Sequence, residues 1–322
     1  MSHQKGNAKK VVFAALAGNL AIAVSKFIAA FLSGSTATLA EAVHSVADTS
    51  NQALLLLGMM LAAKEPNSVH QFGRAAERYF WPFVVALMLF SVGGTFAIYE
   101  GIHRLVVPET TFGSPWWSLG VLSVSFIFES FSFAVAIKEF KVERGNRGYL
   151  ETIIDSRDPT IPLVLLEDAS ALTGLGIALV AVILSAVTGL PIFDSMGSIV
   201  IGCLLCGTAA LLARETHSLL MGEAATPDVQ KKVLQITRET PGVERVTQLK
   251  TMHHGPQHVI LALKVAFPQE MHVEEVEKVT DEIERRIRAA LPEMRSIFIE
   301  PDSRGNLAGI TECDPLNPPD AV

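Results

Sequence analysis

Six apolar stretches, each long enough to cross a lipid bilayer, fill the first two thirds of this 322-residue sequence. A helix needs about 20 predominantly apolar residues to span the hydrocarbon core, and Gly, Ser and Pro residues mark turns between the stretches. We therefore expect an α-helical membrane protein, with a six-helix transmembrane bundle at 11–213 after a short segment at 1–10. The stretches lie at 11–32, 39–62, 80–102, 117–138, 161–187 and 192–213.

The composition fits a bilayer and excludes nucleic acid as the expected partner. Hydrophobic residues make up 49% of the chain and charged residues only 18%, whereas a typical soluble domain carries about 25% charged residues. A net charge of −7 disfavours binding to a polyanion. Three cysteines are too few for a disulfide framework, so the sequence does not require an oxidising compartment.

Basic residues are concentrated at alternate ends of the predicted spans. Loops rich in Lys and Arg stay in the cytoplasm, so both termini are expected there. Because nothing before Lys9 resembles a mitochondrial presequence, we expect a multi-pass protein of a bacterial-type inner membrane. The basic residues of these segments are Lys5, Lys9, Lys10, Lys64, Arg74, Arg78, Lys141, Arg144, Arg147 and Arg157.

The composition changes after the sixth span, where the chain becomes charged and loses its long apolar runs. Periodicity predicts helices at 229–238 and 273–291, and strands at 243–252, 258–267 and 297–299. The order αββαβ predicts a small cytoplasmic α+β domain at 223–302, with its helices on one face of a sheet. The tail at 303–322 has no periodicity and is expected to be disordered.

Several ionisable residues interrupt the predicted spans, although charge is costly inside a bilayer. His44 and Asp48 are four residues apart in the second span, so they share one helix face. Glu167 and Asp168 lie near the start of the fifth span. Imidazole and carboxylate groups are ligands suited to zinc and its neighbours, which favours metal or proton handling. The alternative is that these residues hydrogen-bond helices to one another.

The segment from Gly34 to Asp48 resembles the second-helix signature of the cation diffusion facilitator transporters. In that signature a Gly-Ser turn leads to an acidic residue and then to His/Asp-x-x-x-Asp. Residues 193–202 of the sixth span and the loop at 70–74 also fit the family. The resemblance covers about residues 10–302. It is greatest for the branch that contains the mitochondrial zinc transporter nine of animals and its bacterial relatives.

This resemblance implies a secondary transporter, not an enzyme, that exports a divalent metal ion, usually Zn²⁺, in exchange for protons. It implies no cofactor besides the transported metal ion, and a homodimer formed through the C-terminal domain. His44 and Asp48 occupy the second-helix ligand positions, and Asp168 occupies one of the two fifth-helix positions. His44 is the candidate proton carrier, because imidazole gains or loses a proton near neutral pH.

The other fifth-helix position departs from the family, because Val164 stands where a His is usual. Glu167 is the candidate replacement, and water or the amides of Asn51 and Gln52 are alternatives. The predicted metal ligands are therefore His44, Asp48, Asp168 and Glu167. A larger share of oxygen ligands would admit Mn²⁺, Co²⁺ or Fe²⁺ in place of Zn²⁺.

The C-terminal domain leaves two possibilities open. Histidines cluster around its predicted turn at His253, His254 and His258, where they could bind regulatory metal or lie in a solvated loop. Without metal, the domain would serve as a dimerisation module held by the faces around Val259, Leu261 and Leu263.

Two other functional classes compete with transport. An intramembrane di-aspartyl enzyme could use Asp48 and Asp168, but such chemistry needs a close carboxylate pair, and His44 intervenes on the same helix face. A membrane metal sensor that does not transport would follow if the change at Val164 disabled the site. Cys203 and Cys206 form a C-x-x-C pattern in the sixth span, where packing is the expected role.

Overall fold

The computed structural model describes residues 13, 16–25, 27–28, 31, 36–107, 115–144, 148 and 156–302. The predicted segment 1–10 and tail 303–322 lie outside them. The chain divides into two compact units. The first contains Met1–Lys64 and Glu77–His217, and the second contains Glu65–Ala76 and Ser218–Val322.

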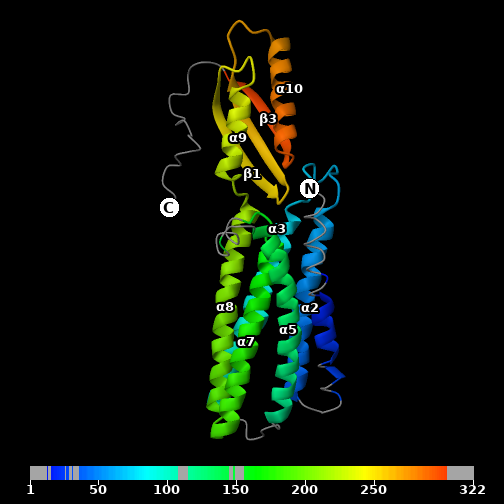
Figure 1. The fold of residues 1–322 in the computed structure, drawn as a ribbon, viewed down its shortest axis with the longest axis vertical. Coiled ribbons are helices and arrows are strands. Elements are labelled where there is room, and N and C mark those ends of the chain that lie inside the picture. The colour runs from blue at the N-terminus through cyan, green and yellow to red at the C-terminus, as the bar shows by residue number, and fades with distance from the viewer. Residues whose placement is uncertain are drawn as a thin grey trace. The chain divides into compact units, whose positions relative to one another are not determined.

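Long helices run side by side in the first unit (Figure 1). Helix α5 packs along α7, and α2 packs against α3. Within the described residues, four helices are long and apolar enough to cross a membrane, and two shorter apolar helices lie at 16–25 and 49–62. The helices are α2 (Thr36–Ala62), α3 (Glu77–Met88), η1 (Leu89–Thr95), α4 (Phe96–Val106), α5 (Pro115–Arg144), α7 (Thr160–Thr188) and α8 (Ile192–Met221).

The third predicted span is not a uniform α-helix. Its middle turn, η1, is a π-helix, and the Thr95 hydroxyl donates a hydrogen bond to the carbonyl oxygen of Phe90, five residues earlier, at 3.0 Å. Small residues bring this span against α8. An added Cβ at Gly202 would lie only 2.8 Å from the carbonyl oxygen of Gly94. Such glycines allow close approach of helix backbones in membranes, where packing drives helix association.

The second unit contains a three-stranded sheet and two helices, α9 (Pro227–Arg238) and α10 (Val273–Ala290) (Figure 1). The strands β1 (Arg245–Gly255), β2 (His258–Ala266) and β3 (Met294–Asp302) lie in that order. β1 and β2 are antiparallel, and β2 and β3 are parallel. The capping box of His272 and Glu275 begins α10, where the His272 N–H donates to the Glu275 carboxylate at 2.9 Å. A helical membrane protein with a small αββαβ domain was predicted, and the fold confirms it.

The core of this domain corrects one expectation. Val259, Leu261 and Leu263 alternate along β2, and their side chains are fully buried in one cluster with residues of α9 and α10. Both helices therefore cover the same face of the sheet. The three side chains fill the core of one chain and are unavailable as the predicted dimer contact.

The connector between α2 and α3 packs on this domain. Phe72 makes edge contacts with the rings of His254 and Phe298, at centroid distances of 6.4 and 6.3 Å. Gly255 permits the approach, because an added Cβ there would lie 2.5 Å from the Cβ of Ala75. The 65–76 connector therefore belongs structurally with the sheet although it joins two helices of the other unit.

Candidate transport site

Helix α7 carries two buried carboxylates. Glu167 is 7% exposed and Asp168 is 3% exposed. Because a charged side chain in the apolar interior needs a partner, the groups around these two residues define the candidate site. They come from α2 and α5.

Two amide side chains of α2 bind the Glu167 carboxylate. Asn51 Nδ2 donates to Oε1 at 3.0 Å, and Gln52 Nε2 donates to Oε2 at 3.3 Å. Both amide residues are buried. Each Glu167 oxygen thus receives an N–H donor from α2, and the hydrogen bonds join α2 to α7.

Asp168 is oriented by a different helix. The Ser132 hydroxyl of α5 donates a hydrogen bond to Asp168 Oδ2 at 2.9 Å. The sequence reasoning missed Ser132. Its only signal was a position three residues after Glu129 in a span that contains several other serines, and serines are common in such helices because they also bond to their own backbone.

Val164 lies one helical turn before Asp168. Its side chain is fully buried and belongs to the apolar core of the bundle, with Leu163 and Leu165. The position that the sequence resemblance matches to a family histidine is therefore filled by packed hydrocarbon, and that match stays a prediction.

The predicted ligands His44 and Asp48 lie on α2, within Thr36–Ala62. Their side chains lie outside the described set. Asn51 follows Asp48 by three residues on the same helix, a spacing that places the two positions on one helix face. Among the side chains that the structure describes, no three His, Cys, Asp or Glu residues are grouped to hold a metal ion.

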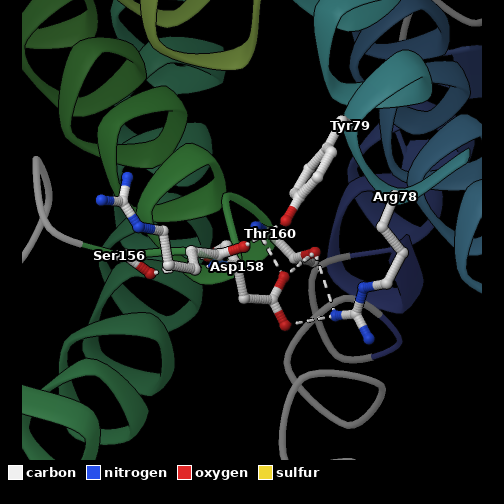
Figure 2. A network of polar contacts seen from close by, with 6 residues as sticks. Arg78, Tyr79, Ser156, Asp158 and Thr160 are labelled. Carbon is white, nitrogen blue, oxygen red and sulfur yellow. Dashed lines mark hydrogen bonds and ion pairs between the residues drawn. The ribbon is translucent and has the colours of Figure 1, made fainter. Parts of the chain in front are cut away.

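A second polar network joins the first turns of α3 and α7 (Figure 2). Arg78 forms an ion pair with Asp158 and also donates to the Thr160 hydroxyl at 3.3 Å. Asp158 Oδ1 accepts hydrogen bonds from the Thr160 hydroxyl and backbone N–H, and the buried Tyr79 hydroxyl donates to the Arg157 carbonyl oxygen at 3.1 Å. The sequence analysis used Arg78 only as one of the basic residues that indicate orientation, and the structure shows that its guanidinium is engaged within the protein.

The C-terminal histidines separate into two environments. The rings of His254 and His258 lie edge to face at 5.3 Å, and His258 Nε2 lies 3.4 Å from the Ser296 hydroxyl. His253 instead lies near the carbonyl oxygen of Gly255. Burial, the neighbouring His254 and Arg295 lower the pKa of His258 below its ordinary value. The structure thus brings two of the three predicted histidines together.

The cysteines of the sixth span do not form a described bond. Cys203 is exposed and Cys206 is half-buried, and both are free. The Cys206 sulfur packs where an added Cβ at Gly94 would lie only 2.5 Å away. This close contact supports the packing interpretation.

A membrane bundle with buried, hydrogen-bonded carboxylates, joined to a small αββαβ domain, defines a multi-pass membrane protein suited to handling cations. Residues 12–221 match the cation efflux transmembrane domain, and residues 225–304 match the cytoplasmic domain of cation efflux proteins. The chain therefore belongs to the cation diffusion facilitator family of metal cation transporters, as the second-helix motif predicted.

The relatives extend this assignment to a branch. The proton-coupled zinc antiporter SLC30A9 of Xenopus laevis, a mitochondrial protein, is 32% identical over 80% of this chain and 46% of its own length. Metal tolerance protein C4 of Arabidopsis thaliana is 32% identical over 83% of this chain and 59% of its own. The predicted branch is confirmed. The chain spans about half the length of the SLC30A9 relatives that it matches.

A more distant bacterial relative covers nearly all of both chains. Magnetosome protein MamB of Magnetospira sp. (strain QH-2) is 23% identical over 90% of this chain and 93% of its own length. The chain thus shares its two-domain organisation with proteins of bacteria as well as those of animals and plants.

Proposed function

We propose that this protein exports Zn²⁺ from the cytoplasm in exchange for protons. The observation that carries the proposal is the buried carboxylate pair Glu167 and Asp168, held on α7 by side chains of α2 and α5. The SLC30A9 relatives are named as proton-coupled zinc antiporters, which supports this choice of substrate. The protein acts as a transporter and not as an enzyme.

The proposed ligands are His44 and Asp48 of α2 with Glu167 and Asp168 of α7. Imidazole and carboxylate donors suit Zn²⁺. A metal ion binds the deprotonated forms of these ligands, so loading the site releases protons, and protonation from the other side favours release of the metal ion. A site that opens alternately to the two faces of the membrane would couple the two flows.

The orientation and assembly are part of the proposal. Basic residues cluster in the segments before the first predicted span at 11–32, between α2 and α3, and between α5 and α7, so we place these segments and both termini in the cytoplasm. The C-terminal domain forms the homodimer, consistent with its match to the cation efflux cytoplasmic domain. The host membrane is of the bacterial inner-membrane type.

The test is zinc uptake into liposomes that contain the purified protein, with and without a pH gradient. Wild type should accumulate more Zn²⁺ with the gradient than without it, and Asp48→Ala should lose this gradient-driven gain. Wild-type transport by Asp48→Ala would overturn the site assignment, and absence of gradient-driven uptake by wild type would overturn zinc–proton exchange.

A metal sensor is the second candidate, because Val164 fills a usual ligand position with packed hydrocarbon. A sensor would bind Zn²⁺ at equilibrium without moving it. Direct binding measured beside the flux assay separates these functions.

A further inference from the structure

Within the part of the chain that the structure describes, each of the two amides that hold Glu167 has an oxygen atom without a hydrogen-bond partner. Asn51 and Gln52 are 3% and 0% exposed, and their nitrogen atoms donate to the Glu167 carboxylate. Within the described residues, Asn51 Oδ1 and Gln52 Oε1 are buried and accept no hydrogen bond. Two such acceptors at consecutive positions are unfavourable unless something binds them.

The position of the nitrogen atoms follows from the charge of the group that they contact. A carboxylate has only acceptors, so each amide turns its N–H toward Glu167. Rotation of the terminal amide by half a turn exchanges the nitrogen and oxygen positions. After that rotation the carbonyl oxygens face the place where the N–H groups now lie, beside the same carboxylate.

A cation bound beside Glu167 would favour the opposite orientation of both amides, with the carbonyl oxygen instead of the N–H group on the Glu167 side. It would replace the two N–H donors as the partner of the carboxylate, and it would attract the carbonyl oxygens. The cluster therefore contains oxygen donors from three residues, Glu167, Asn51 and Gln52. Carbonyl and carboxylate oxygens are ligands that suit Mn²⁺, whereas an imidazole nitrogen is a ligand that suits Zn²⁺.

We propose that Asn51 and Gln52 are specificity-determining residues that turn their carbonyl oxygens to a divalent cation at Glu167 and allow Mn²⁺ to bind beside Zn²⁺. The proposal rests on the proposed function, because the cation is the transported one. It extends that function by assigning the metal selectivity of the site to two neutral side chains of α2. Val164 stands where the family usually has a histidine, so one nitrogen ligand is missing.

The test compares near-isosteric variants that lack the amides. Asn51→Leu and Gln52→Met remove the oxygens and keep most of the side-chain volume. Thr208→Val is the matched control, since it removes another hydrogen bond inside the bundle, between the Ser170 and Thr208 hydroxyls at 2.8 Å. Equilibrium binding of Zn²⁺ and Mn²⁺ to the purified full chain is measured first, and uptake of each metal into liposomes second.

We expect wild type to bind both metals. Removing the amides should lower the ratio of Mn²⁺ to Zn²⁺ affinity by about tenfold, Thr208→Val should leave it unchanged, and Gln52→Glu should restore Mn²⁺ binding relative to Gln52→Met. An equal loss for both metals would mean that the amides only clamp the helices, and would overturn the proposal. Unchanged binding in both amide variants, or a wild type that binds Zn²⁺ but not Mn²⁺, would also overturn it.

The two readouts keep this inference separate from the proposed function. Metal binding without gradient-driven uptake would contradict zinc–proton exchange, while the affinity ratios would still decide the role of the amides. Gradient-driven uptake with an unchanged metal preference in both amide variants would support exchange and overturn the selectivity role.

Discussion

Glu167 and Asp168 are neighbours on α7, and their carboxylates accept hydrogen bonds from side chains of different helices. Glu167 is bound from α2 and Asp168 from α5. Consecutive residues of a helix point about 100° apart, so one pair of acids links three helices. Movement of α2 or α5 relative to α7 would therefore alter the surroundings of one carboxylate before the other.

Ser132 should position Asp168 for metal binding. Ser132→Ala removes the hydroxyl that donates to Asp168 Oδ2, and loss of such an orienting group lowers metal affinity by about tenfold or more. Zinc binding to the purified protein measures the effect. Ser130→Ala is the control on the same helix, because the Ser130 hydroxyl donates to the Phe126 carbonyl oxygen of its own helix. Equal effects of the two variants would contradict a positioning role.

Replacing each acid of α7 by its amide should have different effects at Glu167 and at Asp168. Asp168→Asn removes a ligand charge and should abolish zinc flux while the protein remains folded. Glu167→Gln should lower flux strongly and also disturb α2, because a glutamine amide would meet the amide donors of Asn51 and Gln52. Flux and thermal unfolding in detergent check both effects. Normal flux in Glu167→Gln would remove Glu167 from the ligand set.

Only part of this site could be predicted from the sequence. The spacing of His44 and Asp48 and the acids of α7 predicted a metal site in the bundle. The structure shows that Glu167 and Asp168 are buried and hydrogen-bonded, but the side chains of His44 and Asp48 lie outside the described set, so the ligand set stays a prediction. Ser132 could not be singled out, because it is one of several serines in this helix and serines in apolar helices often bond to their own backbone. The partnership of Glu167 with Asn51 and Gln52 depends on the relative rotation of α2 and α7, which local periodicity does not determine.

The fold likewise has features that the sequence predicts and features that it does not. Hydropathy predicted the spans and alternation predicted β2, because both signals reflect burial of regularly spaced residues. The π-helical turn at η1 has no local hydropathy signal, and its Gly93 and Gly94 lie against α8. The pairing of Arg78 with Asp158 joins residues 80 positions apart, so only the tertiary fold could reveal it.

Close packing at Gly202 should make it intolerant of even one methyl group. In Gly202→Ala the new Cβ would lie 2.8 Å from the Gly94 carbonyl oxygen, and overpacking of this kind costs about 1–3 kcal/mol. Gly207→Ala on the same helix is the control, since no described residue outside its own helical turn lies within 4 Å of the added atom. Thermal unfolding in detergent should show a lower Tm for Gly202→Ala alone. An equal response would contradict the close helix contact.

The ion pair of Arg78 and Asp158 should couple α3 to α7. Its side chains are 15% and 28% exposed, so solvent screening is limited, and contacting pairs commonly couple by about 1 kcal/mol. A double-mutant cycle with Arg78→Met and Asp158→Asn measures the coupling by chemical unfolding. The more exposed pair Lys264 and Glu300 should couple by less than about 0.5 kcal/mol. No difference between the two cycles would contradict a structural role for Arg78.

His258 should make the protein less stable in mild acid. Burial, followed by His254 and Arg295, lowers the pKa of His258 in the folded chain. As pH falls through about 6.5, the ordinary pKa of histidine, the unfolded chain binds a proton before the folded chain does, so stability falls. His258→Asn should reduce the loss of Tm between pH 7.5 and pH 5.5, whereas His70→Asn, in an exposed loop position, should not. A larger loss of Tm at low pH in His258→Asn than in wild type would contradict a lowered pKa of His258.

Reciprocal coupling of zinc and protons is the most direct test of the account. Liposomes containing the protein and a lumenal pH indicator are given an inward zinc gradient without any initial pH difference. Zinc entry through wild type should drive protons out and raise the lumenal pH, and Asp168→Asn should abolish both movements together. Zinc entry through wild type with no change of lumenal pH would contradict metal–proton exchange.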